Sequence, residues 1–266
     1  MATRKYNAIK LTDPSRSDQV EDSLALEHPL SIAVNGEAFT LTMQSPGNED
    51  ELIRGLLFTE GIVRKKSGRL QSEILERSEE GFISKVNLDI NDEDLDKSQL
   101  NKRNLLSVAS CGICGKTELQ SPSSDAILTS EVIRLQDVKS MFAAMSSAQS
   151  AFQESGGSHA SAAFNPDKKM LVIMEDIGRH NAVDKVIGYL LNEGILKEAK
   201  CLLVSGRVSY EIVTKCFMAG IPFLMAVSAP SSLAVDFAKE LGITLMGFCR
   251  EDRATIYSHP ERLVSH

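Results

Sequence analysis

The chain has 266 residues, and its 42% hydrophobic and 24% charged content is ordinary for a globular protein and excludes disorder of the whole chain. A formal net charge of −7 excludes the broad basic face that nonspecific nucleic-acid binding requires. The N-terminus has no apolar signal-peptide core, and no run of about 18 apolar residues occurs in the sequence. An odd number of cysteines fits a reducing compartment, so a cytoplasmic protein away from the membrane is expected.

Residues 1–28 are polar and show no clear periodicity, and they are expected to form a flexible N-terminal segment. Residues 29–104 carry the signals of a small α+β domain. Asn35-Gly36 is the favoured sequence of a type I′ turn and lies between two strand-like runs. A β-hairpin is therefore expected over residues 31–43.

A helix is expected after this hairpin, because Asn48 is followed three residues later by Glu51, the spacing of a capping box. Gly61 lies just past the expected end of the helix. Further strand-like stretches lie near residues 73–75 and 82–90. The helix has an apolar face made of Leu52, Ile53, Leu56 and Leu57.

Residues 105–128 are expected to form a long loop that carries two cysteines three residues apart, Cys111 and Cys114. Two thiols at this spacing can be a metal clamp, a redox pair or a sulfur carrier. A structural zinc site normally needs four ligands, and no second CxxC or HxxxH is present, so no zinc is expected. Gly112 and Gly115 let a large partner approach the thiols closely, which favours a delivery loop.

Residues 129–266 are predicted to form the main domain, an α/β unit with a mainly parallel sheet and flanking helices. A helix is expected from Ser130 to Gly156, and from residue 170 onward short apolar strands alternate with helices. The cysteines outside the CxxC stand alone in apolar runs and are expected to be buried: Cys201, Cys216 and Cys249. The expected strands are 170–174, 201–204, 222–227 and 243–248, with helices at 181–191, 209–219 and 232–241 between them.

Polar residues follow three of these strands at the strand-to-helix turns, where ligands bind in sheets of this kind. Glycines there let backbone amides face a ligand, helix starts favour anions, and arginines can form bidentate contacts with phosphate. A phosphate or nucleotide crevice is therefore expected. Helix capping by the turn serines and core packing of the histidines remain open for the individual residues. The candidate binding residues are His159, Gly178, Arg179, His180, Ser205, Gly206, Arg207 and Ser228.

The assembled motifs resemble those of the formate dehydrogenase accessory sulfurtransferase family, FdhD. The resemblance covers nearly the whole chain and implies a cytidine-deaminase-like main domain, a smaller N-terminal domain and a homodimer. A zinc deaminase requires H-x-E with P-C-x-x-C, whereas His159 is followed here by Ala160-Ser161, so deamination is not expected. The matching motifs lie at residues 29–36, 59–62, 110–115, 157–159, 175–185, 205–209, 219–222 and 227–230.

The resemblance also implies an activity. A cysteine desulfurase would supply sulfane sulfur, Cys111 and Cys114 would hold or relay it as a persulfide, and a molybdenum or tungsten bis(guanine dinucleotide) cofactor would receive it for formate dehydrogenase. The turns at Arg179 and Arg207 would bind that cofactor, and a GDP-like nucleotide could occupy the same place. Which thiol accepts sulfur first, and which metal is used, stay open.

Two functions from other classes remain open beside this one. A thiol-disulfide oxidoreductase would place its CxxC directly after a strand and at a helix start, whereas this pair lies in a glycine-rich stretch. A noncatalytic chaperone would only hold the cofactor and would carry no sulfur.

Overall fold

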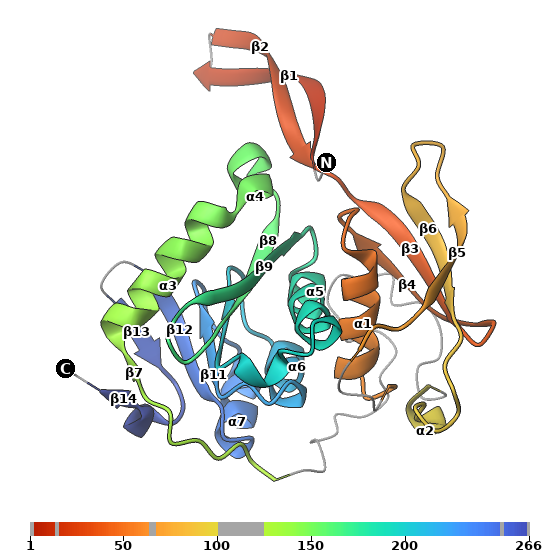
Figure 1. Cartoon of the computed structure of the whole chain (residues 1–266). Helices are drawn as coiled ribbons and strands as arrows, with labels where there is room; N and C mark the ends of the chain where they lie inside the picture. The colour runs from red at the N-terminus through yellow and green to blue at the C-terminus, as the bar shows by residue number, and fades with distance from the viewer. Residues whose placement is uncertain (1–2, 14–15, 64–67, 101–124, 251–252, 265–266) are drawn as a thin grey trace.

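A six-stranded sheet forms the centre of the larger domain in the computed structural model (Figure 1). The structure describes residues 3–13, 16–63, 68–100, 125–250 and 253–264. The strand order in this sheet is β13-β12-β11-β10-β8-β9. Its strands are β8 (His159–Phe164), β9 (Met170–Asp176), β10 (Cys201–Val204), β11 (Phe223–Ala226), β12 (Thr244–Arg250) and β13 (Arg253–Ile256).

The sequence predicted that neighbouring strands of this sheet pair mainly in parallel, and this part of the prediction is wrong. Strands β10, β11 and β12 pair in parallel, but β8 pairs antiparallel with both β10 and β9, and β13 pairs antiparallel with β12. Strand β8 was not expected, because it is rich in alanine and buried along nearly its whole length, so it shows no alternation. Strands β9 to β12 nevertheless all run in one direction, and their carboxyl ends reach the same edge.

Helices cover both faces of this sheet. On one face, α5 (Arg179–Asn192), α6 (Tyr210–Met218) and α7 (Ser232–Glu240) form a core with side chains such as Leu202, Leu224 and Leu245. On the other face, α3 (Leu135–Ala148) packs on Leu203 and Met225, as expected from the alternation of side chains along a strand. The helix expected over 130–156 is divided at Gln149, after which α4 (Ser150–Ser155) ends at Gly156. None of the helices in the described ranges is long and apolar enough to cross a bilayer.

Short elements complete this domain. Strands β7 (Ile133–Arg134) and β14 (Leu263–Val264) pair in parallel, and two 3₁₀ helices, η1 (Leu196–Glu198) and η2 (Pro260–Arg262), lie in connecting segments. The mixed α/β class is confirmed. The cytidine-deaminase-like description stays a prediction.

The smaller domain is a four-stranded sheet with one long helix. The sheet order is β4-β3-β6-β5, and the hairpin turn at Asn35-Gly36 is confirmed, with φ of +51° and +80° at the two residues. Helix α1 begins where expected, but Asn48 makes no side-chain cap, so the capping-box prediction is wrong. The elements are β3 (His28–Val34), β4 (Glu37–Gln44), α1 (Glu49–Thr59), β5 (Ser72–Arg77), β6 (Ile83–Leu88) and α2 (Lys97–Leu100).

The two domains are joined through a very close crossing of α1 and α5 (Figure 1). A Cβ atom on Gly55 of α1 would overlap the backbone carbonyl of Asp184, and one on Gly188 of α5 would overlap the carbonyl of Glu51. Only glycine at these two positions lets the helix backbones approach so closely. The smaller domain therefore packs on α5, the helix that begins at the predicted binding turn.

Most of the N-terminal segment expected to be flexible has regular structure, and its flexibility stays a prediction. Strands β1 (Thr3–Asp13) and β2 (Arg16–Ala25) pair antiparallel as a long hairpin that projects from the rest of the molecule (Figure 1). Most of its side chains are exposed. These strands carry no clear signal in the sequence, because no buried face imposes a pattern of alternating apolar residues.

Candidate functional site

The three strand-to-helix turns meet at one edge of the six-stranded sheet, as the sequence predicts. They follow β9, β10 and β11, which run in the same direction. The second and third turns are joined through the backbone of Val208, whose N–H donates to the carbonyl of Ala229 at 3.1 Å. The N–H of Ser231 in turn donates to the carbonyl of Val208 at 2.9 Å.

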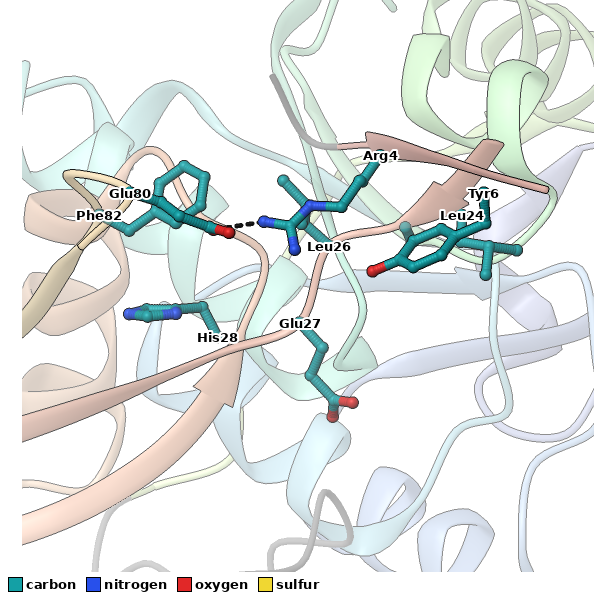
Figure 2. A pocket seen from close by; sticks show the side chains of 9 residues that line it. Arg4, Tyr6, Leu24, Leu26, Glu27, His28, Glu80 and Phe82 are labelled. Carbon is teal, nitrogen blue, oxygen red and sulfur yellow. Dashed lines mark hydrogen bonds and ion pairs between the residues drawn. The ribbon is translucent and has the colours of Figure 1, made fainter. Parts of the chain in front are cut away.

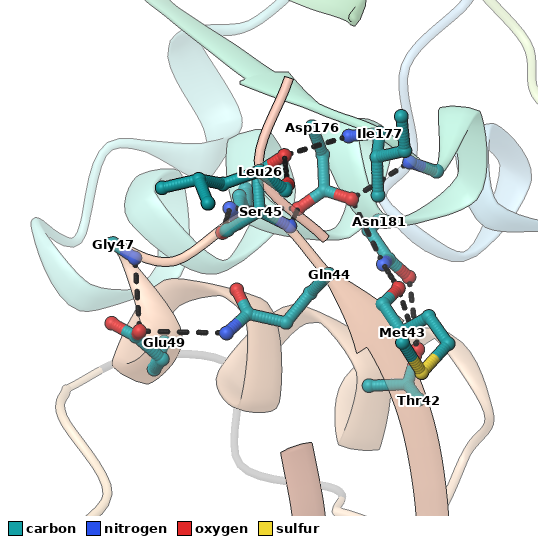
Figure 3. Close-up of polar contacts among 12 residues, drawn as sticks. Leu26, Thr42, Met43, Gln44, Ser45, Gly47, Glu49, Asp176, Ile177 and Asn181 are labelled. Atoms are coloured by element: carbon teal, nitrogen blue, oxygen red, sulfur yellow. Dashed lines mark hydrogen bonds and ion pairs between the residues drawn. The ribbon is translucent and has the colours of Figure 1, made fainter. Parts of the chain in front are cut away.

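The first turn is held by Asp176, the last residue of β9 (Figure 3). Its fully buried carboxylate accepts hydrogen bonds from the N–H of Ser45 (3.0 Å), the N–H of Gly178 (2.8 Å) and the side-chain amide of Asn181 (3.0 Å). The Nζ of Lys185 lies 2.8 Å from the same carboxylate and also donates to the carbonyl of Ser45. Because Ser45 follows β4 of the smaller domain, this buried network fixes the turn to that domain.

Four of the predicted residues come together beyond this network, and we call them the strand-end site: His159, Arg179, Gly206 and Arg207. A Cβ atom on Gly206 would lie 3.3 Å from Nδ1 of His159 and 3.5 Å from Cβ of Arg179. The absence of a side chain at Gly206 therefore lets the histidine and the arginine approach each other across the second turn.

Burial is the main cause that lowers the pKa of His159, because it disfavours the charged ring. The positive charges of Arg179 and Arg207 lower the pKa further, whereas Asp176 acts in the opposite direction. His159 is therefore neutral at neutral pH, and the positive charge of the site comes from the two arginines. Arg179 is half-buried, and its Nε atom has no hydrogen-bond acceptor among the described residues. Arg207 is exposed.

His180, Ser205 and Ser228 have structural contacts that the sequence did not reveal. The ring Nε2 of His180 lies 3.2 Å from Oγ of Ser209, and only 7% of the residue is exposed, so it joins the first two turns. The hydroxyl oxygen of Ser205 accepts a hydrogen bond from the N–H of Ala160 at 2.9 Å and thereby ties the second turn to β8. The carbonyl of Ser228 accepts from Phe248.

Sequence reasoning missed the residues that position the site. Asp176 and Lys185 lie within the matched motif, but no local pattern indicates their roles, and their buried pairing is visible only in three dimensions. Glu175 also has a positioning role, because its carboxylate accepts from the N–H groups of Ala151 and Phe152 at 2.8 Å and thereby holds α4 against β9. One signal was available in the sequence: two adjacent acids, Glu175 and Asp176, end a strand shortly before Gly178. Because a buried charge is costly without partners, such acids are expected to be held by hydrogen bonds or cations.

A groove of about 670 Å³ lies beside the strand-end site and shares His159 with it, and Ser205 of the second turn also lines the groove. Its walls are mainly apolar, and its volume falls in the range of small-molecule sites. The groove lies between α3 and the strand ends on the face opposite α5. Its other lining residues include Phe142, Met145, Phe152, Val227, Arg250 and Arg253.

The three solitary cysteines are buried free thiols, as predicted. Burial raises the pKa of Cys201 to about 12 and that of Cys249 to about 11, and it also raises the pKa of Cys216. These thiols are therefore poor nucleophiles at neutral pH. Cys111 and Cys114, together with most of the predicted 105–128 loop, lie outside the described residues. Within the part of the chain that is described, no three His, Cys, Asp or Glu side chains form a possible metal cluster.

Comparisons with known proteins agree with the resemblance. Residues 25–264 match the model of the FdhD/NarQ family. The chain is 42% identical over 254 residues to the sulfur carrier protein FdhD of Mycolicibacterium paratuberculosis, which covers 91% of this chain and 92% of the relative. It is 37% identical over 266 residues to the protein of the same name from Saccharolobus solfataricus, which covers 98% of each.

The fold also matches a solved structure. A crystal structure described as a formate dehydrogenase accessory protein from Desulfotalea psychrophila has a TM-score of 0.76 with this chain at 24% identity, covering 99% of this chain and 100% of the other. This likeness concerns the fold alone, and the sequence matches decide the family. Because the family model spans nearly the whole sequence, the chain belongs to the FdhD/NarQ family.

Proposed function

We propose that this chain is a sulfur carrier. It takes persulfide sulfur from a cysteine desulfurase onto Cys111 or Cys114 and passes it to a molybdenum or tungsten bis(guanine dinucleotide) cofactor required by formate dehydrogenase. Relatives that align with nearly the whole chain are named sulfur carrier proteins. The two cysteines lie outside the described residues, so their role rests on the sequence and on these relatives.

The observation that best supports binding of this substrate is the position of two arginines beside a neutral histidine. The buried Nε of Arg179 has no acceptor among the described residues, and a buried donor without an acceptor is costly. A phosphate oxygen would supply that acceptor, and Arg207 could contact the same diphosphate from the neighbouring turn. The electropositive strand-end site therefore fits the phosphates of a guanine dinucleotide.

The two cysteines provide a balanced route for the sulfur. The thiolate of the first attacks the outer sulfur of the desulfurase persulfide, so that one S–S bond breaks, a new one forms on this chain and the desulfurase leaves as a thiolate. The second thiolate then attacks the inner sulfur of the new persulfide. This step forms a Cys111–Cys114 disulfide and releases the outer sulfur as sulfide to the metal substrate. An external dithiol returns the disulfide to two thiols.

Mass spectrometry of the intact protein after incubation with a cysteine desulfurase and cysteine tests the carrier role. A gain of about 32 Da on Cys111 or Cys114 is expected, because one sulfur atom is added to form a persulfide. Peptide mapping identifies the modified thiol. Replacing both residues, as Cys111→Ser with Cys114→Ser, should abolish the gain.

Cys249→Ser is the matched control, since this thiol is buried and its raised pKa keeps it protonated, and this variant should load as the wild type does. A loss of about 2 Da that appears without any release of sulfide would instead indicate a disulfide formed by direct oxidation, the product expected of a thiol-disulfide oxidoreductase, because the carrier forms this disulfide only as it releases sulfide. An unchanged mass would favour a chaperone that only holds the cofactor. Either result contradicts the proposal.

A further inference from the structure

Glu211 is a buried carboxylate at the start of α6. The residue is 5% exposed, and neither of its carboxylate oxygens has a hydrogen-bond partner among the described residues. Lys215 lies one turn further along the same helix, but its ion pairs are with Asp184 and Glu60. A buried charge without such partners is costly, and the N-terminal end of a helix offsets only part of that cost. The position of Glu211 therefore calls for a reason other than stability.

His180 faces this carboxylate from the start of α5. Its ring Nε2 lies 4.0 Å from Oε2 of Glu211 and 3.2 Å from Oγ of Ser209. The same ring nitrogen is thus close to both the acid and the hydroxyl. The acid does not contact the hydroxyl directly, because the Glu211 oxygens have no hydrogen bond within the described part of the chain.

Ser209 occupies the N-cap position of α6 but does not cap the helix. Serine is a preferred N-cap residue because its oxygen accepts from an N–H group of the first turn, yet the Ser209 side chain makes no such bond. The corresponding residue of α7, Ser231, accepts from the N–H of Ala234 at 3.2 Å. In the described ranges the Ser209 hydroxyl has one hydrogen bond, which is with His180.

We infer that Ser209 donates a hydrogen bond to a phosphate oxygen of the nucleotide at the strand-end site, and that Glu211 is a positioning residue for this contact. The carboxylate favours a hydrogen on Nε2 of His180, because a lone pair on that nitrogen would be repelled. Nε2 then donates to the Ser209 oxygen, and the hydroxyl hydrogen is left for the ligand. This inference rests on the proposed function, since the ligand is the diphosphate of the guanine dinucleotide.

Ser209 lies between the two turns that carry the arginines. It follows Arg207 by two residues and contacts His180, which is next to Arg179 in the sequence. The first-turn N–H groups of α6, which Ser209 leaves uncapped, lie at the same place. An anion there would accept from the hydroxyl and from the helix N-terminus together. With its hydrogen turned toward His180, the hydroxyl would instead present only lone pairs, which repel phosphate.

The pocket of about 290 Å³ between the β1–β2 hairpin and the smaller domain lacks such donors (Figure 2). Its arginine, Arg4, is paired with Glu80 of the β5–β6 turn. Glu27 adds a second carboxylate to the lining. Two carboxylates against one paired arginine do not favour a phosphate, so this pocket does not compete with the strand-end site for the diphosphate.

Calorimetric titration with GDP tests the Ser209 contact. Ser209→Ala should raise the dissociation constant roughly tenfold, because a hydrogen bond to a charged phosphate is lost. Ser209→Thr should bind GDP much as the wild type does, since it keeps the hydroxyl and the extended backbone at this position, with φ of −96°, suits a β-branched residue. Thr214→Ala is the matched control, because it removes from the same helix a hydroxyl that donates to the carbonyl of Tyr210. Its affinity for GDP should equal that of the wild type.

Glu211→Gln tests the positioning role. Glutamine has nearly the same shape but no charge, so Nε2 loses its preference for the hydrogen and the affinity for GDP should fall several-fold. In a Ser209→Ala background the same substitution should cost nothing further, because Glu211 acts through the Ser209 hydroxyl. The nitrogen chemical shifts of the His180 ring give a readout that a merely structural role would not move. Nε2 should carry a hydrogen in the wild type, and the Nδ1–H tautomer should gain population in Glu211→Gln.

The outcomes separate this inference from the proposed function. Binding of GDP that depends on Arg179 but not on Ser209 would overturn the inference and leave the proposed substrate in place. Additive losses in the double variant, or a bare Nε2 in the wild type, would show that Glu211 does not act through Ser209. A wild-type protein that fails to bind GDP would overturn both. If Glu211→Gln does not fold, the comparison of Ser209→Ala with Ser209→Thr still decides whether the hydroxyl binds the ligand.

Discussion

Arg179 and Arg207 come from neighbouring turns, and both lower the pKa of His159, but they differ in burial. Arg179 is half-buried with an unsatisfied Nε among the described residues, whereas Arg207 is exposed to water. Water already solvates most of the Arg207 guanidinium, so a phosphate gains less by contacting it. Binding of a diphosphate should therefore depend more on Arg179 than on Arg207.

Calorimetric titration with GDP measures this difference. A charge-assisted hydrogen bond contributes about 1.5–3 kcal/mol, so Arg179→Ala should weaken GDP binding roughly tenfold to a hundredfold. Arg207→Ala should weaken it in the same direction by a smaller factor. Persulfide loading should be unchanged in both variants, because neither arginine takes part in the thiol exchange.

Arg69→Ala serves as the control, since Arg69 is exposed and pairs with Glu193 away from the strand ends. This variant should bind GDP as the wild type does. Equal affinities for GDP in the wild type and in both strand-end variants would place the nucleotide elsewhere on the molecule.

Helices α1 and α5 connect the smaller domain to the first candidate binding turn, and their contact depends on two glycines. Each glycine lies against a backbone carbonyl of the other helix. A methyl group at either position cannot be accommodated by a side-chain rotation, because the neighbouring atoms are backbone. The helices would have to separate, which would also displace Arg179 at the start of α5.

Gly188→Ala should therefore destabilise the protein by about 3 kcal/mol or more, at the upper end of the cost of overpacking. Alanine ordinarily favours a helix over glycine, so a local effect of helix propensity would have the opposite sign. Urea unfolding followed by circular dichroism measures the free energy. Ser147→Ala on the exposed face of α3 is the control. If Gly188→Ala and this control have the same free energy of unfolding, the α1–α5 crossing is looser than described.

At the scale of the whole molecule, the sequence predicted the elements that have a regular pattern or a specific turn. Asn35-Gly36 identified a hairpin, and the alternation of short apolar strands with helices from residue 170 placed three polar strand-to-helix turns at one edge. The sequence did not reveal β8, because its alanines are buried on both faces and leave no periodicity. It also missed the N-terminal hairpin, which has no buried face.

The candidate binding residues were easier to find in the sequence than the residues that hold their turns in place. Arg179, Gly206 and Arg207 lie in short motifs, and the chemistry of each motif can be inferred from the residues of its own turn. One partner of Asp176 is Ser45, more than a hundred residues earlier in the chain, and no local pattern connects them. Long-range polar pairing of this kind is a property of the folded structure.

A second buried ion pair connects the domains at the level of the whole fold. The Nζ of Lys215 on α6 lies 2.7 Å from the carboxylate of Asp184 on α5 and donates to Oγ1 of Thr59 on α1 at 2.9 Å. All three residues are buried. Lys215 of the larger domain thus contacts α1, the long helix of the smaller domain.

Lys215→Met should destabilise the whole molecule by about 3–5 kcal/mol, because it leaves the Asp184 carboxylate buried without its cation. The double variant Lys215→Met with Asp184→Leu should recover part of that loss, since it removes the Asp184 charge but leaves the Glu60 carboxylate, which lies 3.6 Å from the Lys215 Nζ, without this cation. Urea unfolding gives the free energies, and hydrogen exchange of α1 and of β10 shows whether the two domains still open together. Because α1 is joined to α5 and α6, we expect both segments to exchange with the same free energy of opening in the wild type. A double variant as unstable as the single one would mean that the pair contributes through its specific geometry and not only by neutralising a buried charge.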